Sequence, residues 1–253
     1  MLLKGWNLLG FCLLCGYAST LRSANLYLTE VTPFAFVKDG KGSYDGINVR
    51  IAHELSRRSG VSFELVVVPS ARHLLMFPAD KEAYSISQAE NFTEQEGIFL
   101  SEVTQFPIMV VAPRGAVLKN YDDLIALSME RGIGMMRRLS YGSFGQDERV
   151  RKVEINTLEN GMRMLEAGRI SGIVGSQPAI LAAAEKNASA NLLGPGLIIS
   201  YGSHVMRVRP EFASSATSKT ISSTLLAMKN DGSIARILDD FLKEPKIGLQ
   251  SAK

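Results

Sequence analysis

The sequence predicts an α/β protein whose chain folds into two lobes. Short apolar and β-branched runs alternate with amphipathic stretches along most of the 253 residues, a pattern typical of α/β sheets with ligand sites at the strand ends. The alternation restarts near residue 110, and the chain closes with helices after a strand that begins at 204. We therefore expect two crossings between the lobes and a ligand cleft between them.

The first part of the chain supplies the clearest single elements. The segment 25–31 is expected to be a strand, because apolar residues sit among β-formers. The segment 47–60 is expected to be a helix, because Ile51 and Leu55 share one face and Gly60 is a suitable C-terminal cap. Further expected elements are turns at 38–46, strands at 61–68 and 83–87, and a short helix at 70–77.

The second part begins with an apolar, β-branched strand at 106–112, ended by Pro113. The turn at 140–149 is expected to lead into a helix, and an apolar stripe places the helix at 233–243 against the core. The remaining expected elements are helices at 121–131, 157–168, 178–187 and 211–229, and strands at 132–136, 153–155, 169–175, 197–200 and 204–209.

The N-terminus has the order of a secretory signal peptide. Lys4 is followed by an apolar run at 8–14 and then by small residues. A helix needs about 20 residues to span a bilayer, so this run is too short. We expect residues 1–20 to be removed, with cleavage near Ala18 or Thr20; a membrane anchor or a buried strand is the alternative.

Composition excludes several kinds of site. The net charge of +3 provides no strong field for nucleic acid. Cys12 and Cys15 both lie in the predicted signal peptide, so cysteine catalysis and thiolate metal sites are excluded from the mature chain. His53, His73 and His204 follow no metal-ligand spacing, and a lone histidine is more often structural. We expect no metal and no cofactor.

Five segments, taken in order, carry a resemblance to a known family. They are TPFAF (32–36), YDGINVRIAHELSRRSGV (44–61), VPSARHLL (68–75), MLEAGRISGIVGSQPAI (164–180) and LLAMKNDGSIARILDDFL (225–242). The chain resembles the extracytoplasmic solute-binding proteins of family 3, whose best-known members bind polar amino acids for ABC importers. The resemblance covers nearly the whole mature chain.

This resemblance implies a type II periplasmic-binding-protein fold, in which two α/β lobes are joined by a two-strand hinge. Lobe 1 would comprise 21–108 with 204–253, and lobe 2 would comprise 109–203. The expected protein is a periplasmic monomer that binds a small molecule. The lobes would close on the solute, and a permease in the inner membrane would recognise the closed form.

The two charged anchors of the amino-acid-binding members are missing. Those members carry Thr-x-x-Arg in the loop after the strand that matches 83–87, and the arginine donates two parallel hydrogen bonds to the ligand carboxylate. Here the loop at 93–96 is Thr-Glu-Gln-Glu, and Ser176 stands where an aspartate would take the ligand ammonium. Burying an unpaired charge costs several kcal/mol. We therefore expect a polar solute other than an ordinary α-amino acid, held by hydroxyls, amides and aromatic faces.

Candidate ligand contacts come from positions that match the family's cleft. They are Phe34, Arg72, Ser87, Gln88, Glu90, Ser140, Tyr141, Gly142, Ser176 and Gln177. Phe34 matches a position where family members stack an aromatic ring, with a core phenylalanine as the alternative. Arg72 is the remaining candidate cation on lobe 1, with a surface ion pair as the alternative.

The other candidates follow strands or open helices. Residues 87–90 follow the strand at 83–87, with a solvated loop as the alternative. Residues 140–142 open a helix, where backbone N–H groups bind anions and Ser140 can act as the cap. Ser176 and Gln177 precede the helix at 178–187, which they could simply cap.

Three functions compete. The first is a binding protein for an ABC importer. The second is a sensor or accessory module that signals through a separate chain. The third is an enzyme like the periplasmic cyclohexadienyl dehydratases, which needs a general acid in the cleft; Glu90, Glu94 and Glu96 are the acids clustered near the expected site. No nucleophilic triad or phosphate loop is visible in the sequence, so we expect no catalysis.

Overall fold

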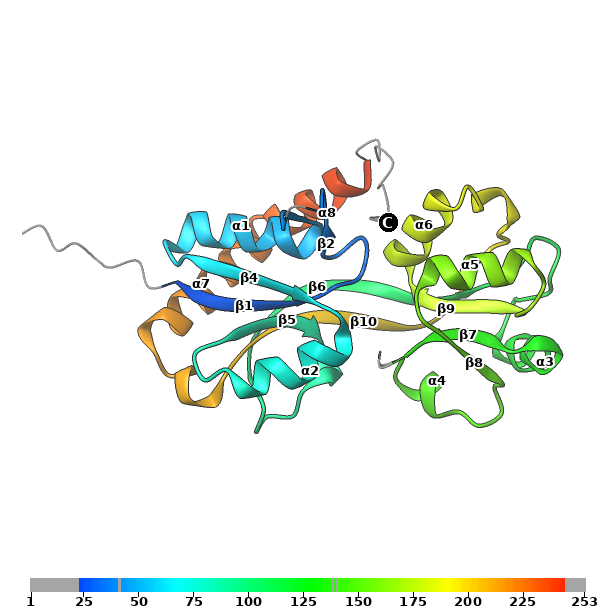
Figure 1. Cartoon of the computed structure of the whole chain (residues 1–253), viewed down its shortest axis with the longest axis horizontal. Coiled ribbons are helices and arrows are strands. Elements are labelled where there is room, and N and C mark those ends of the chain that lie inside the picture. The colour runs from blue at the N-terminus through cyan, green and yellow to red at the C-terminus, as the bar shows by residue number, and fades with distance from the viewer. Residues whose placement is uncertain (1–22, 41, 138, 140, 244–253) are drawn as a thin grey trace, which may run out of the picture.

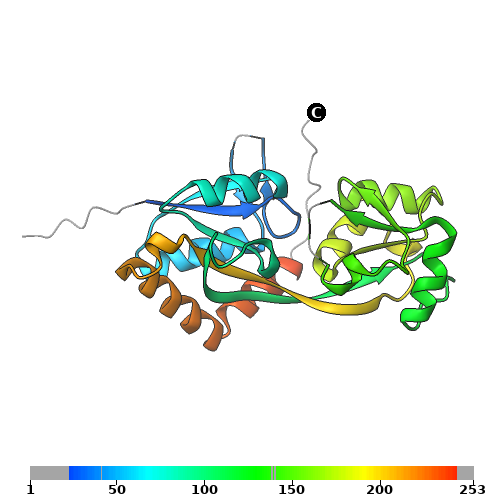
Figure 2. The same cartoon turned by 90° about the horizontal axis from the view of Figure 1, so that it is seen from below.

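The computed structural model describes residues 23–243, apart from residues 41, 138 and 140. The predicted signal peptide at 1–20 and the candidate contact Ser140 lie outside the described residues. In the described part, two lobes lie on either side of a pair of long strands (Figure 1; Figure 2). No helix in this part has the length and apolar character that crossing a bilayer requires.

One mixed sheet of eight strands runs through both lobes in the order β4-β1-β5-β10-β6-β9-β7-β8. In lobe 1, β1 pairs in parallel with β4 and β5, and in lobe 2, β7 pairs in parallel with β8 and β9. The strands are β1 (Ala24–Thr29), β4 (Phe63–Val68), β5 (Tyr84–Gln88), β6 (Ile98–Val111), β7 (Ile133–Met136), β8 (Lys152–Ile155), β9 (Gly172–Ser176) and β10 (Leu197–Val208).

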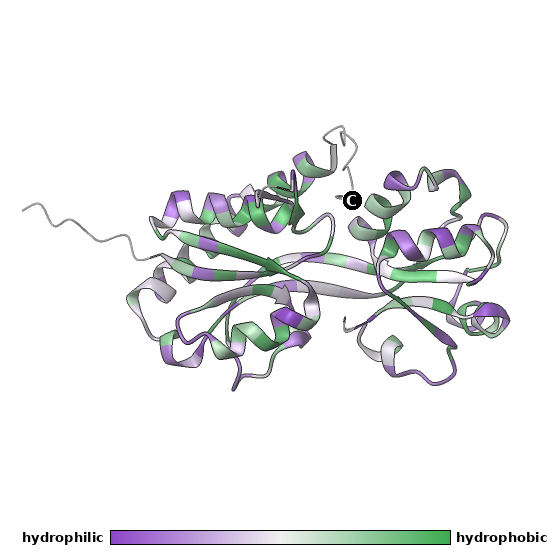
Figure 3. Cartoon of the chain, in the orientation of Figure 1, coloured by the Kyte–Doolittle hydropathy of each residue, from purple (hydrophilic) through white to green (hydrophobic). Residues whose placement is uncertain are grey.

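Helices cover the sheet in each lobe. In lobe 1, α1 (Ile47–Ser59), α7 (Ala216–Asn230) and α8 (Ser233–Lys243) pack on one another, and α2 (Ser70–Ala79) packs on β1. Lobe 2 carries α3 (Tyr121–Arg131), α4 (Ser143–Gln146), α5 (Leu158–Glu166) and α6 (Gln177–Lys186), of which α5 and α6 pack on β9. Figure 3 shows hydrophobic and hydrophilic stretches alternating along these helices, as amphipathic packing requires.

The long strands β6 and β10 connect the lobes as a two-stranded ribbon. They pair antiparallel along most of their length. The β5 strand pairs with β10 from His204 onward, and β9 pairs with β6 from Ile108 onward. Between these points, residues 105–107 of β6 and 201–203 of β10 pair only with each other among the described strands. This short ribbon is the place where the sheet can bend most easily.

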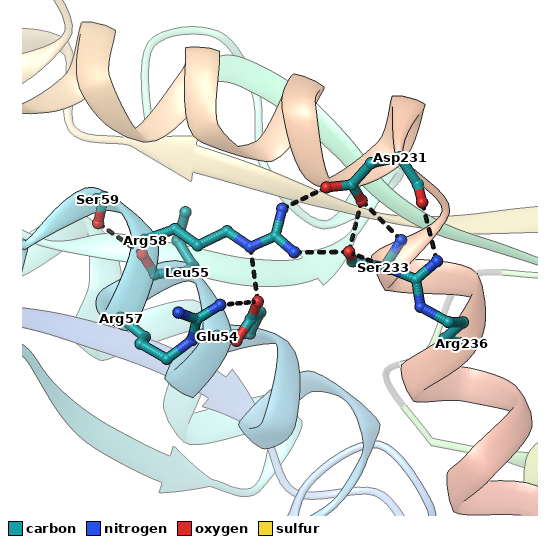
Figure 4. Close-up of polar contacts among 8 residues, drawn as sticks. All are labelled: Glu54, Leu55, Arg57, Arg58, Ser59, Asp231, Ser233 and Arg236. Carbon is teal, nitrogen blue, oxygen red and sulfur yellow. Dashed lines mark hydrogen bonds and ion pairs between the residues drawn. The ribbon is translucent and has the colours of Figure 1, made fainter.

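A polar network fastens α1 to the turn between α7 and α8 (Figure 4). Arg58 bonds the carboxylate of Asp231, the Glu54 carboxylate at 2.6 Å and the Ser233 hydroxyl at 2.7 Å. Arg236 donates to the Asp231 carbonyl at 2.9 Å. Hydrogen bonds from Arg57 and Arg58 hold the pKa of the Glu54 carboxyl below its usual range, and hydrogen bonds from Ser233 and Arg58 do the same for Asp231. The network therefore joins the N-terminal and C-terminal parts of lobe 1.

Two strand predictions were incomplete. The segments expected at 197–200 and 204–209 form one continuous strand, β10, because pairing with β6 holds residues 201–203 extended although Gly202 weakens strand formation. The strand expected at 106–112 is the second half of β6, which starts at Ile98. The expected turn at 38–46 lies in a short antiparallel hairpin. Strand β2 (Phe36–Val37) precedes the turn, and β3 (Tyr44–Asp45) falls within its expected range.

The helices follow the expected ranges more closely. The helix expected at 121–131 is α3, with the same bounds. The helix expected at 211–229 starts later, at Ala216, because Ser215 caps it by accepting a hydrogen bond from the Ser218 N–H; a 3-10 turn precedes it. The helix expected from the 140–149 segment is reduced to the four residues of α4, which lie within that segment. The lobe boundaries at 108/109 and 203/204 stay a prediction.

Candidate functional site

A cleft lies where the lobes meet, and both contribute to its wall. Lobe 1 and the long strands supply Thr29, Val31, Phe34, Asn48, Ile86, Gln88, Asn91, Phe106 and His204; lobe 2 supplies Met136, Leu139, Tyr141, Leu158, Gly175, Ser176 and Ala179. The cleft encloses about 40 Å³, room for about three water molecules. Its described lining contains no Asp, Glu, Lys or Arg.

Four predicted contacts line this cleft, namely Phe34, Gln88, Tyr141 and Ser176. The other described candidates are not among the residues that line it. Arg72, Glu90, Gly142 and Gln177 are exposed, whereas Ser87 is buried beside Ser85. The pattern "polar residue after a strand" thus selected several residues that line the cleft, but it did not separate them from neighbours outside the lining. Ligand contact by any of these residues stays a prediction.

Asn48 and His204 are cleft residues that the sequence reasoning missed. Asn48 is 2% exposed and His204 is 8% exposed. The Asn48 Nδ2 atom lies 3.1 Å from His204 Nδ1, across 156 residues of sequence. A signal did exist for Asn48, because it is a polar residue beside the apolar stripe of α1. For His204 the sequence showed only a lone histidine in a strand.

The imidazole of His204 packs against two phenylalanine rings that also contact each other, with their centroids 5.1 Å apart. Its centroid lies 4.4 Å from that of Phe34 and 4.9 Å from that of Phe106, both edge-on. Burial, assisted by the nearby His73, lowers the pKa of His204 to about 3, so the ring is neutral near pH 7. Because an amide N–H₂ only donates, His204 Nδ1 accepts from Asn48 and the ring proton is on Nε2.

Comparison with known proteins rests on structure alone. No protein-family model and no curated protein sequence matches the chain. Among solved structures, the GluR0 ligand-binding core in complex with L-glutamate has a TM-score of 0.72 and 15% identity, over 88% of this chain and 99% of that one. A mutant of ArgBP from T. maritima has a TM-score of 0.68 and 19% identity, over 88% and 96%.

A third similar structure is a histidine kinase sensor domain with similarity to periplasmic binding proteins. Its TM-score is 0.69 with 17% identity, over 88% of this chain and 98% of that one. This chain has the two-lobe periplasmic-binding-protein fold. The fold predicted from the sequence resemblance is therefore confirmed.

In this binding-protein fold, a glycine positions Asn48 against the loop that carries Phe34. Gly46 adopts φ 132°, and a Cβ there would lie 2.4 Å from the Phe34 carbonyl oxygen. The close approach lets the Asn48 N–H donate to the Phe34 carbonyl at 2.8 Å and the Ile47 N–H donate to the Pro33 carbonyl at 3.0 Å. The start of α1 and the loop after β1 thus form one unit of the cleft wall.

A second buried histidine supports Thr29, another cleft residue of lobe 1. His73 Nδ1 lies 2.8 Å from Thr29 Oγ1, and His73 Nε2 lies 2.9 Å from Ser85 Oγ. The side chains of Tyr27, Phe77 and Phe92 surround it, and burial lowers its pKa to about 4. The neutral imidazole of His73 on α2 is therefore hydrogen-bonded to both β1 and β5.

An arginine from β10 holds the loop at 89–97, which contains the segment Thr93–Glu96. Arg207 of β10 is 7% exposed and donates to the carbonyls of Ala89 and Gly97, at 3.1 and 2.6 Å, and to Glu94 at 3.0 Å. Glu96 accepts from the N–H and hydroxyl of Thr93, both at 2.9 Å. Glu94 and Glu96 are thus engaged within lobe 1.

Tyr141 and Ser176 form the polar part of the lobe 2 wall. Tyr141 is 5% exposed, and burial raises the pKa of its phenol. Ser176 ends β9 and precedes α6, with no capping hydrogen bond from its side chain. The hydroxyls of both residues are uncharged near pH 7, so this wall offers hydrogen bonds without a counter-charge.

Proposed function

We propose that this protein is an extracytoplasmic solute-binding protein that captures a small polar solute between its lobes for an ABC importer. The solute is not an ordinary α-amino acid. The observation that carries the proposal is a cleft built by both lobes whose described lining has no formally charged residue. A zwitterion held there would lose water around two charges and gain a partner for neither.

The two anchor positions support this choice of solute. The loop at 93–96 contains no arginine, and its carboxylates bond Thr93 and Arg207. Ser176 lines the cleft where an aspartate would bind an ammonium. Transport also fits the predicted signal peptide at 1–20, which would direct the mature chain to the periplasm.

The test is a thermal-shift panel on the mature chain, residues 21–253. The panel contains α-amino acids, polyamines, sugars, organic acids and uncharged amides. A solute at about 100 times its Kd adds about 2.7 kcal/mol to folded-state stability, which raises the melting temperature by roughly 5–10 °C for a chain of this size. We expect such a rise with an uncharged polar solute.

Two results would contradict the proposal. A clear rise with a standard α-amino acid shows that the two charged anchors have been replaced elsewhere in the cleft. No rise with any member of the panel removes the support for solute capture altogether.

A sensor role is the second candidate, because this fold also occurs in a histidine kinase sensor domain. A transport protein and a sensor differ in what deletion of the gene does. Loss of transport abolishes uptake of the labelled solute, whereas loss of a sensor leaves uptake intact and changes the transcriptional response to the solute.

We also propose that the cleft binds its solute without catalysing a reaction. The dehydratase alternative needs a carboxylic acid at the solute, and Glu90, Glu94 and Glu96 do not contribute to the described cleft lining. Incubation of the protein with a prephenate-like substrate, followed by chromatography, is expected to return the substrate unchanged. Turnover that is lost in Glu90→Gln or Glu96→Gln would overturn this part.

A further inference from the structure

Asn48, a residue of the cleft lining, carries a buried side-chain oxygen with no hydrogen-bond partner among the described residues. Asn48 Oδ1, Thr104 Oγ1, Arg207 Nε and Arg209 Nε are the buried side-chain atoms of the described residues that lack a hydrogen bond. Of these residues, Asn48 lines the cleft. A buried acceptor left unpaired costs about 1–3 kcal/mol, and a donor on a solute would remove that cost.

The neighbours of Asn48 determine which chemistry fits. An N–H of its Nδ2 donates to His204 Nδ1. Its Oδ1 has no partner in the described part of the chain and is left as an acceptor for a bound solute. His204 also lines the cleft and can donate only from Nε2. An acceptor and a donor on adjacent side chains match a solute that carries a donor next to an acceptor, as a carboxamide does.

The rings beside this pair favour an uncharged solute. Phe34 and Phe106 are 3% and 4% exposed, line the cleft and pack edge-on to the imidazole. A carboxylate next to Asn48 Oδ1 would oppose the partial negative charge of that oxygen. An ammonium would meet no carboxylate among the described lining residues.

We propose that the cleft selects an uncharged solute carrying an N–H or O–H donor, and that the carboxamide oxygen of Asn48 accepts this donor. The inference rests on the proposed capture function and names its ligand class. It makes the Asn48–His204 pair, rather than a charged anchor, the element that orients the solute.

The test uses matched chemical series on the wild-type mature chain. One series is propanamide, N,N-dimethylpropanamide and propanoate; the other is benzamide, N,N-dimethylbenzamide and benzoate. Ribose and glucose supply O–H donors, and the α-amino acids supply zwitterions. Calorimetry near pH 7 measures each Kd. The primary amide of a series, or a sugar, is expected to bind at least about tenfold more tightly than the dimethyl amide and the carboxylate.

Asn48→Leu then tests the acceptor, with whichever uncharged probe binds most tightly. The change keeps the side-chain size and removes the oxygen. We expect Kd to rise about fivefold or more for the donor-bearing probe and to stay unchanged for the dimethyl amide. The same change at exposed Asn230, which does not line the cleft, is the control and is expected to leave Kd unaltered.

Each other outcome has a defined meaning. Tighter binding of a carboxylate or zwitterion overturns this inference but leaves solute capture standing. Equal binding of primary and dimethyl amides, or an unchanged Kd in a folded Asn48→Leu variant, overturns the role of Asn48. If Asn48→Leu does not fold, the wild-type series decides. Binding of no solute at all overturns both the capture function and this inference.

Discussion

Gly46 is the single residue on which the placement of Asn48 depends. Its φ of 132° lies outside the range that side chains favour, and an added Cβ would meet a backbone oxygen that cannot move aside. We expect Gly46→Ala to lower the free energy of unfolding by about 2–4 kcal/mol. Solute affinity should fall as well, because the start of α1 must separate from the Phe34 loop.

Gly60, at the other end of the same helix, provides the matched control. It also has a positive φ, of 72°, but a Cβ there would meet no atom within 4 Å. Gly60→Ala should therefore cost about 1 kcal/mol of stability from backbone strain and leave the solute Kd unchanged. Denaturant unfolding measures the stability of the two variants, and calorimetry measures their solute Kd. The comparison separates the cost of backbone strain, which both share, from the steric clash with the Phe34 carbonyl, which only Gly46→Ala has. Equal effects of the two changes would contradict the role given to Gly46.

The buried histidines predict an acid-sensitive fold. Burial lowers the pKa of His73 to about 4 and of His204 to about 3, from 6.5. The unfolded chain therefore binds more protons than the folded one below about pH 6.5, and stability is lost progressively as pH falls from there through the folded pKa values. His73 faces Thr29, Ser85 and aromatic rings, and His204 faces Asn48 and two phenylalanines, so no carboxylate offsets the loss.

Denaturant unfolding at about pH 7 and about pH 5 measures this dependence. Each buried histidine should contribute on the order of 1–2 kcal/mol to the difference. His73→Gln should reduce the dependence, and the same change at the exposed His53 serves as the control. A stability that is flat between these pH values would show that both rings accept a proton without leaving their sites.

At the scale of elements, the loop at 89–97 depends on β10 through Arg207. Its guanidinium reaches two loop carbonyls and Glu94, and the loop carries the cleft residue Asn91. Arg207→Met would leave the buried carbonyls unpaired, so we expect a loss of about 2–4 kcal/mol in stability. The solute Kd should also rise, because Asn91 would no longer be held.

Arg72 is the matched control for this substitution. It is an exposed arginine of the same lobe and lies outside the described cleft lining. Arg72→Met is expected to leave the melting temperature unchanged, because its side chain is exposed and makes none of the loop contacts of Arg207. A raised Kd in Arg72→Met alone would instead support the prediction, made from the sequence, that Arg72 contacts the solute.

The elements show where sequence reasoning succeeds and where it stops. The helix at 121–131 was predicted with its observed bounds because its pattern and ends are local. Phe34, Gln88, Tyr141 and Ser176 were found because residues near strand ends gather at the cleft. The Asn48–His204 contact joins positions 156 residues apart, and no local pattern encodes which polar residues will share a buried site.

At the scale of the whole molecule, the ribbon between the lobes was the hardest part to predict. Tyr201, Gly202 and Ser203 resemble a turn in the sequence, and this split β10 into two expected strands. Their pairing with residues 105–107 of β6 holds them extended. Among the described strands, this segment pairs with β6 alone, because β5 and β9 join the sheet on either side of it, and this arrangement suits a hinge.

The volume of the cleft predicts that the lobes must separate for a solute to enter. The space enclosed is about 40 Å³, whereas pockets for small molecules usually have about 300–1,000 Å³. We expect the solute-free protein to populate a more open arrangement in solution, and a solute that contacts both walls to shift the population toward closure.

Fluorescence energy transfer can follow this closure directly, since residues 23–243 contain no cysteine. Lys81→Cys in lobe 1 and Met129→Cys in lobe 2 place dyes at exposed positions on opposite sides of the ribbon. Transfer between them is expected to change on titration with the tightest solute, with a midpoint at its Kd. A pair within lobe 1, Lys81→Cys with Arg57→Cys, should show no change. A constant signal from the inter-lobe pair at saturating solute would mean that binding occurs without hinge motion.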